Sequence, residues 1–369
     1  MIEPIRIDCI SARGLFALFS VVALSACATQ NAPVPNDKAV DAIMQAYAGD
    51  VPGASVLVVR DGKPLVRKAY GLANLEEKTA ATPATNYRLA SMTKQFTAAS
   101  ILLLAEDGRL SLDDPIRKWL PTLPETDQAI TIRHLLTHTG GLIDYEDIMA
   151  DAGNEDPVTD FSRQLRDIDV LHLLEKEQRV YFAAGTSYRY SNGGYSMLAL
   201  IVERASGQSF QSFLHDRIFK PLHMDNTLAY VVEGPSVPNR AYGYTPVDGK
   251  WQRTDQSLTS AVLGDGGIYS SIDDLAKWDA ALYDARLLSD ASRKLAFTPW
   301  TKTDDASIDY GFGWRITGET LWHSGESIAF RNVIVRWPQR HLSVIILTNR
   351  NDPEPYRMAL SIAELFLAK

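Results

Sequence analysis

A serine hydroxyl and a lysine amine stand three residues apart at Ser91 and Lys94. If the chain is helical from this point, the two side chains lie on one face of the first turn. A serine becomes a nucleophile when a neighbouring group takes its proton, and a lysine can do this if burial or nearby cations keep it neutral. Free N–H groups at a helix start also favour an oxyanion. The pair is a candidate nucleophile and base, although the same spacing is typical of a surface serine beside a solvated lysine.

The residues after this pair predict that helix. Phe96, Ala99, Leu103 and Leu104 recur at helical spacing, and no proline interrupts them. Gly108 then supplies a stop signal. Helix geometry would therefore hold the hydroxyl and the amine together.

Two further motifs carry side chains that could act with this pair. Tyr190-Ser191-Asn192 precedes a predicted helix, and His323-Ser324-Gly325 ends a predicted strand. Together with the S-x-x-K motif, they resemble the three motifs of the serine β-lactamase and penicillin-binding protein superfamily. The second motif has the Y-x-N form of class C β-lactamases and D,D-carboxypeptidases. Residues 134–142 and 264–267 also resemble landmarks of this family, so the resemblance spans nearly the whole chain after its leader.

The resemblance implies a role for each motif residue. Ser91 would be the acylated nucleophile, Lys94 would hold or take its proton, and Tyr190 would be the second acid/base group. Asn192 would bind both Lys94 and a substrate carbonyl, since an amide both donates and accepts hydrogen bonds. The backbone N–H groups of Ser91 and Glu326 would form the oxyanion hole, and substrate would also contact His323, Ser324 and Gly325. Taken singly, Tyr190 could be a packed aromatic residue and Asn192 a turn residue.

The third motif departs from the β-lactamase pattern, because His323 stands where a lysine is typical. A lysine is a permanent cation for a substrate carboxylate, whereas a histidine is largely neutral near pH 7. The departure weakens the case for a true β-lactamase. An H-x-G motif occurs in some D,D-peptidases, D-amino-acid peptidases and esterases related to this family.

The order of predicted elements indicates a discontinuous fold. Two β-rich runs flank Asp61-Gly62, a strong hairpin signal, and strands return after residue 310 before a closing helix over 355–367. We expect an α/β (α+β) fold of the β-lactamase/D,D-peptidase type, with an antiparallel sheet from both chain ends flanked by helices. Residues 38–105 and 265–369 would form the α/β domain, and residues 106–264 an inserted, mainly helical domain.

Within the helical part, the spacing predicts helices over 133–138, 170–180, 195–204 and 210–219. Residues 144–160 are acidic and contain glycine and proline, which predicts a surface loop. Residues 233–260 are predicted to be loop-rich. These two segments would build the substrate pockets.

The first 26 residues have the layout of a secretory signal peptide, in which an apolar run over 15–24 follows Arg6 and Arg13. Leu24-Ser25-Ala26-Cys27 resembles the bacterial lipobox, which implies that Cys27 becomes the lipidated first residue. A plain signal peptide with an incidental cysteine is the alternative. Residues 27–37 would be a flexible tether. The resemblance implies a periplasm-facing protein held by its lipid, with the outer membrane as the expected site because Ala28 rather than Asp follows the cysteine.

Composition and missing motifs exclude several other functions. The formal net charge is -8, which argues against a nucleic-acid partner. His134 and His138 have the i, i+4 spacing of zinc ligands, but Leu135 stands where a zincin needs glutamate. No G-x-S-x-G elbow, G-x-G-x-x-G motif or P-loop is present. We therefore expect no metal and no cofactor.

These observations predict a serine hydrolase that forms an acyl-enzyme at Ser91. The first substrate hypothesis is D-amino-acid peptide amides of the cell-wall stem-peptide type, with β-lactams as acylating agents. The alternatives are an esterase of small acyl esters, a β-lactamase, and a penicillin-binding sensor without turnover.

Overall fold

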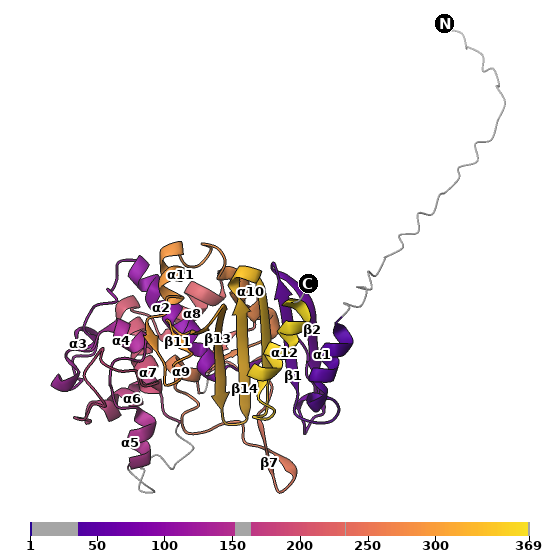
Figure 1. The fold of residues 1–369 in the computed structure, drawn as a ribbon, viewed down its shortest axis with the longest axis horizontal. Helices are drawn as coiled ribbons and strands as arrows, with labels where there is room; N and C mark the ends of the chain where they lie inside the picture. The colour runs from indigo at the N-terminus through magenta and orange to yellow at the C-terminus, as the bar shows by residue number, and fades with distance from the viewer. Residues whose placement is uncertain (2–35, 152–163, 233, 368–369) are drawn as a thin grey trace. The chain divides into compact units, whose positions relative to one another are not determined.

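The computed structural model describes residue 1 and residues 36–151, 164–232 and 234–367. Within these residues, the largest sheet has eight antiparallel strands in the order β10-β11-β12-β13-β14-β15-β1-β2 (Figure 1). The strands are β1 (Ala54–Arg60), β2 (Lys63–Tyr70), β10 (Thr301–Lys302), β11 (Asp309–Tyr310), β12 (Arg315–Thr317), β13 (Thr320–Ser327), β14 (Phe330–Trp337) and β15 (Leu342–Thr348). Pairing of β1 with β15 joins the early strands to the late ones, as expected from the sequence.

The hairpin between β1 and β2 forms where the Asp-Gly signal predicts it. Asp61 has a φ of 50° and Gly62 a φ of 71°, so both turn residues are left-handed. Such a turn matches the right-handed twist of the two strands that it joins. Local sequence alone therefore determines this part of the sheet.

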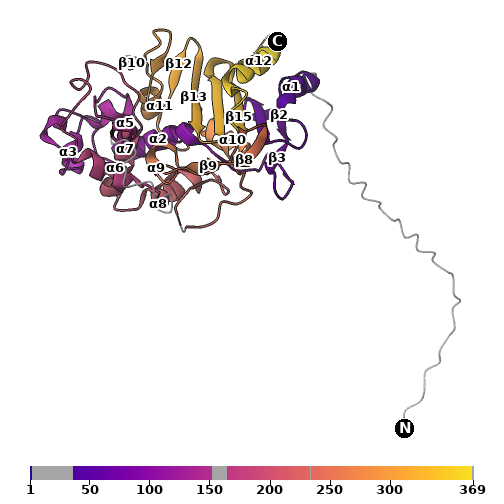
Figure 2. The same cartoon turned by 90° about the horizontal axis from the view of Figure 1, so that it is seen from below.

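Each face of the sheet buries alternate residues of its strands. On β15, Val344 and Ile346 pack in one cluster with residues of α1 (Asp37–Ile43) and α12 (Pro355–Leu367), while Ile345 and Leu347 pack in the cluster on the other face. The second cluster includes residues of α2 (Lys94–Glu106) and α10 (Ile272–Ala281). Figure 2 shows α1 and α12 on one side of the strands and α10 on the other. The continuous apolar run of β15 reflects this burial on both faces.

The segment between β2 and β10 contains most of the helices and several short strands. Its helices, besides α2 and α10, are α3 (Ile116–Trp119), α4 (Ile132–Leu136), α5 (Tyr145–Asp151), α6 (Asp167–Leu174), α7 (Asn192–Ser206), α8 (Phe210–Leu214), α9 (Leu263–Gly266) and α11 (Asp290–Ala296). Its short strands are β3 (Leu72–Asn74), β4 (Thr79–Ala80), β5 (Tyr87–Arg88), β6 (Leu228–Ala229), β7 (Tyr244–Val247), β8 (Lys250–Arg253) and β9 (Ile268–Ser270). The chain also has short turns of 3-10 or π type: η1 (Gln45–Tyr47), η2 (Ala90–Thr93), η3 (Glu125–Asp127), η5 (His215–Phe219) and η6 (Pro338–Arg340).

Two local expectations are wrong and a third is incomplete. The predicted surface loop over 144–160 begins with the helix α5, and residues 152–160 lie outside the described residues. The predicted helix over 170–180 ends at Leu174, because the chain turns there and Val180 forms a bridge with Leu142. The described part of the segment 233–260 is mainly loop, but it also contains the β7–β8 hairpin, whose turn has Asp248 and Gly249 at positive φ. Turn residues and long-range pairing decide these segments, rather than local composition or spacing.

Contacts group residues 34–369 into one compact unit. The division into an α/β domain and an inserted helical domain therefore stays a prediction. The predicted leader, the lipidation site Cys27 and nearly all of the tether fall outside the described residues. Among those that are described, no helix is long and apolar enough to cross a membrane.

Candidate active site

Ser91 lies in a tight turn between a short strand and a long helix. β5 pairs with β9, and the 3-10 turn η2 then leads into α2. Ala90 has a φ of 49°, a left-handed conformation that is strained for a residue with a side chain. This sharp turn leaves Ser91 at the amino end of α2. The α-helix itself begins at Lys94, and Ser91 lies in the 3-10 turn directly before it, near the first turn as predicted.

Lys94 connects the serine to the second motif. The side chain is fully buried, and its Nζ donates to Oγ of Ser91 at 3.1 Å, to Oδ1 of Asn192 at 2.7 Å and to the carbonyl oxygen of Asp265 at 3.0 Å. An ammonium has three N–H donors, so these three contacts account for all of them. Lys94 is therefore held in one position by α2, α7 and α9 together.

Tyr190 lies against the same amine. Nζ of Lys94 is 4.8 Å from the centre of the Tyr190 ring, and the guanidinium of Arg315 is 5.7 Å from it. The ring also packs on that of His138, with centroids 4.3 Å apart. The next residue, Ser191, caps α7 by accepting from the N–H of Gly194. Packing and capping together hold the tyrosine between two cations.

The third motif differs most from its predicted role. His323 is only 1% exposed; its Nδ1 lies 2.6 Å from the carbonyl oxygen of Ser324 and its Nε2 lies 3.0 Å from the hydroxyl of Tyr310. Burial, with a further contribution from Arg315, lowers the pKa of His323 well below its ordinary value. The imidazole is neutral, and both of its nitrogens already have partners.

Gly325, two residues further along β13, packs directly on the turn that carries Ser91. A Cβ at this position would lie 1.9 Å from the carbonyl oxygen of Leu89 and 3.2 Å from the backbone nitrogen of Met92. Only glycine allows this approach. Gly325 thereby brings the backbone of the neighbouring Glu326 close to the turn, while Ser324 is half-buried between His323 and Gly325.

A pocket of about 180 Å³ opens beside Ser91. Of the predicted site residues, Ser91, Asn192 and Glu326 line it, whereas Lys94 and His323 are buried and do not. Tyr190 lines another cavity with Tyr188 and Asp304. Lining residues that the sequence did not indicate include Arg88, Glu146 and Asp265.

Two of these unpredicted residues are carboxylic acids in contact with the motif residues. Glu146, in α5, accepts from Nδ2 of Asn192 at 3.2 Å, and burial raises its pKa. Asp265 accepts from the hydroxyl of Tyr145 at 2.9 Å, and burial raises its pKa to about 7. The sequence predicts that residues 144–160 help to build the substrate pockets, but as a loop; it gives no sign that Glu146 lies in a helix and contacts Asn192.

The two histidines with zinc-like spacing have structural contacts. Nδ1 of His134 accepts from the backbone N–H of Thr131 and completes the cap of α4. Nδ1 of His138 accepts from the backbone N–H of Ser191, and burial lowers the pKa of this histidine. Among the described residues, no group of three or more histidines, cysteines and acids could hold a metal ion.

Comparisons with known proteins show the family of this chain. The Beta-lactamase family matches residues 36–369. The chain belongs to the β-lactamase family. Penicillin-binding protein 4* of Bacillus subtilis (strain 168) is 32% identical over 323 residues, which are 83% of this chain and 70% of that protein. Protein flp of Staphylococcus aureus (strain NCTC 8325 / PS 47) is 30% identical over 319 residues, which are 82% of this chain and 61% of that protein.

Solved structures of other proteins have the same fold. An octameric penicillin-binding protein homologue from Pyrococcus abyssi superposes with a TM-score of 0.78 at 28% identity, covering 90% of this chain and 77% of the other. The hydrolase EstCE1, described as having promiscuous acyltransferase activity, gives a TM-score of 0.74 at 23% identity over 89% of this chain and 97% of the other, a likeness of fold. The predicted fold class is thus confirmed, and the protein is a serine hydrolase of the β-lactamase family.

Proposed function

We propose that this serine hydrolase forms an acyl-enzyme at Ser91 and cleaves D-amino-acid peptide amides of the cell-wall stem-peptide type, with β-lactams as acylating agents. The observation that carries the proposal is the position of Lys94, whose buried Nζ contacts both Oγ of Ser91 and Oδ1 of Asn192. In a surface serine–lysine pair, the lysine would be exposed and would have no further contact such as the one to Asn192. Similarity to penicillin-binding protein 4* supports the part of the proposal that concerns β-lactams.

The first chemical step would join Oγ of Ser91 to the substrate carbonyl carbon. In the reacting form Lys94 would be the neutral amine, with its lone pair facing Oγ of Ser91 in place of one N–H donor. It would take the hydroxyl proton, and the carbonyl oxygen would become an oxyanion. The backbone N–H groups of Ser91 and Glu326 would bind that oxyanion. Support for this pairing comes from Gly325, whose contact with Leu89 brings the two backbone segments together.

Collapse of the tetrahedral intermediate would break the bond from carbon to the leaving nitrogen. The leaving amine takes the proton of the Tyr190 hydroxyl, and Lys94 returns its proton to Tyr190. A water molecule then attacks the Ser91 ester, gives one proton back to the serine oxygen through the same pair, and releases the acid. The centre of the Tyr190 ring lies 4.8 Å from Nζ of Lys94, so the phenol and the amine are neighbours in the site.

A direct test measures release of D-alanine from an acyl-D-alanyl-D-alanine peptide. The native protein should release D-alanine and should leave the peptide ending in L-alanine intact. Ser91→Ala should release none. Equal rates for native and Ser91→Ala proteins, or equal rates on the two peptides, would contradict the proposal.

An esterase of small acyl esters is the second candidate, favoured by one observation. His323 is buried and neutral, so the third motif offers no cation to a substrate carboxylate. Hydrolysis of a neutral ester combined with no reaction on either peptide would establish this alternative. Rapid consumption of a penicillin would instead indicate a β-lactamase. Stable acylation by the penicillin without turnover would indicate a sensor.

We also propose that the chain is lipidated at Cys27 and held at the periplasmic side of the outer membrane. The support is the pattern of residues 15–27 alone. Fractionation of cells that express the full chain tests this: Cys27→Ala should move the protein from the outer-membrane fraction to the soluble periplasm. An unchanged distribution would contradict lipid anchoring.

A further inference from the structure

A peptide that ends in a free carboxylate needs a cation near Ser91, and the third motif does not supply one. His323 is neutral and occupied on both nitrogens. Lys94 uses its three donors on Ser91, Asn192 and Asp265. Any recognition of a carboxylate must therefore come from another residue of the pocket.

Arg88 has the properties that such a residue requires. It lies three positions before Ser91, lines the same pocket, and is 3% exposed. Its Nε and Nη1 are buried and have no hydrogen-bond partner within the described part of the chain. A buried guanidinium with unpaired donors is destabilising unless an acceptor completes it.

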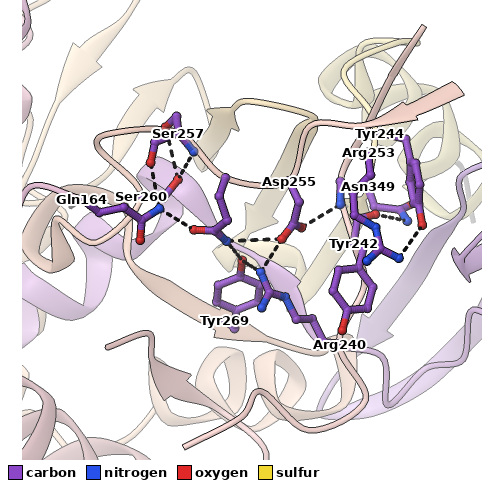
Figure 3. A network of polar contacts seen from close by, with 12 residues as sticks. Gln164, Arg240, Tyr242, Tyr244, Arg253, Asp255, Ser257, Ser260, Tyr269 and Asn349 are labelled. Carbon is purple, nitrogen blue, oxygen red and sulfur yellow. Dashed lines mark hydrogen bonds and ion pairs between the residues drawn. The ribbon is translucent and has the colours of Figure 1, made fainter. Parts of the chain in front are cut away.

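Among the described residues, Tyr269 contacts the Arg88 side chain, but no carboxylate pairs with it. On the neighbouring strand β9, Tyr269 is its register partner, with the guanidinium 6.0 Å from the tyrosine ring. The carboxylate beside Tyr269 belongs to Asp255, which pairs with Arg240 and accepts from the backbone N–H of Gly243 at 2.8 Å (Figure 3). Asp255 is therefore committed to Arg240.

Acidic side chains in the pocket also have partners of their own. Glu146 accepts from Asn192, Asp265 accepts from Tyr145, and Glu326 lies 3.5 Å from the guanidinium of Arg331. These carboxylates would repel an anion from the other parts of the pocket. The hydroxyl-bearing residues Ser257 and Thr259 line it together with Arg88. Among the described residues that line the pocket, Arg88 is the one with a positively charged side chain.

We propose that Arg88 binds the carboxylate of the substrate's leaving group and so determines specificity for substrates that end in a free acid. A guanidinium presents two parallel N–H donors to a carboxylate, a geometry that a lysine lacks. This inference rests on the proposed acyl transfer at Ser91. In this proposal Arg88, a residue of β5, binds the substrate carboxylate that the neutral His323 cannot bind.

Two matched esters test the inference. Both carry a phenylacetylglycyl acyl group; one has 3-hydroxybenzoate as leaving group, and the other has methyl 3-hydroxybenzoate, which lacks the charge. In Arg88→Gln, kcat/KM for the acid ester should fall about 10- to 100-fold, mainly through KM, as expected for loss of a charge-assisted hydrogen bond. For the methyl ester, kcat/KM should stay within about twofold, because no charged contact is lost.

Control variants separate the possible outcomes. Arg217→Gln removes a cation that is paired with Asp107 and does not line the pocket, and it should leave the ratio of the two rates unchanged. If Arg88→Gln does not fold, Arg88→Lys decides, because loss of the two-donor geometry should still lower the acid-ester rate about fivefold relative to the methyl ester. An unchanged ratio in the Arg88 variants, or a changed ratio in Arg217→Gln, would overturn the inference. Ester hydrolysis that persists in Ser91→Ala would instead contradict the proposed function.

Discussion

Gly325 packs so closely on Leu89 that a Cβ on the glycine would lie 1.9 Å from the leucine carbonyl oxygen. The contact joins β13 of the main sheet to the turn before α2. Because Leu89 is two residues before Ser91, it fixes the distance between the proposed nucleophile and the backbone of Glu326. The oxyanion site is therefore expected to depend on a residue that has no side chain.

Gly325→Ala should damage both stability and activity. The methyl group would meet backbone rather than a flexible side chain, so the strand or the turn must move, at an expected loss of about 1–3 kcal/mol in the free energy of unfolding. Ester hydrolysis should fall about 100-fold through loss of oxyanion binding. Urea unfolding and steady-state kinetics measure the two effects.

Gly108→Ala is the matched control for this variant. Gly108 has a φ of 67°, and a Cβ added to it would meet no atom within 4 Å, so only the backbone preference changes. The variant should lose about 1 kcal/mol of stability and keep native kinetics. If Gly325→Ala keeps native kinetics, as expected for Gly108→Ala, then catalysis does not depend on the close approach of β13 to the turn before α2.

Lys94→Met should lower kcat/KM on an ester about 1000-fold, because the proposed base disappears while the shape of the side chain is largely kept. Lys302→Met provides the comparison, since Lys302 is exposed and contacts only the nearby Asp309 among the described residues. That variant should remain within about twofold of the native rate, because exposed pairs contribute little. Comparable rates for the two variants would show that Lys94 takes no part in proton transfer.

Asp265→Asn should flatten the dependence of stability on pH. The folded pKa of Asp265 is raised to about 7, so between about pH 4 and pH 7 the folded state holds a proton that the unfolded state has lost. The contribution of the Asp265 carboxyl to the free energy of unfolding has its full value below about pH 4. It is lost as the pH rises from there through 7, a decrease of up to about 4 kcal/mol. Asparagine has no such proton but can still accept from Tyr145.

Urea unfolding of both proteins at several pH values from about 4.5 to about 8.5 provides the measurement. The difference between native and Asp265→Asn stability should shift in favour of the variant as the pH increases. Parallel curves would mean that burial does not perturb the Asp265 carboxyl.

His323→Lys should unfold more easily rather than acquire a carboxylate site. The new ammonium would be buried next to Tyr310, and it would face the positive charges of Arg315 and Lys94 that already act on His323. We expect a loss of at least about 3 kcal/mol, as for an unpaired buried charge. His323→Gln, which adds no charge, should lose less. Thermal unfolding of the native protein, His323→Lys and His323→Gln measures these losses. A stable lysine variant that prefers substrates with a free acid would contradict the buried position of His323.

Local signals made much of the fold predictable. The Asp61-Gly62 turn specifies a hairpin without help from distant residues, and the closing helix α12 has the predicted bounds. The apolar spacing after Lys94 correctly predicts α2, and the motifs that contain Ser91, Lys94 and Asn192 do meet in the structure. In each case, residues close in sequence carry the information.

Residues that reach the site through long-range pairing were not predictable. Arg88 lies beside Tyr269 because β5 pairs with β9, a strand about half the chain away in the sequence. Glu146 reaches Asn192 only because α5 forms within a segment whose composition is typical of a loop. Burial of His323 depends on Tyr310 and on packing across the sheet. The sequence gives the residue types, but tertiary contacts decide which polar side chains keep an unpaired hydrogen-bond donor.

The most direct test of an acyl-enzyme at Ser91 is intact-mass spectrometry of the chain from residue 36 onward after incubation with a penicillin, with native protein beside Ser91→Ala. The native protein should gain the mass of one penicillin, and peptide mapping should place the adduct on Ser91, while the alanine variant stays unmodified. An adduct of equal yield on Ser91→Ala, or an adduct mapped to another residue of the native protein, would contradict Ser91 as the nucleophile.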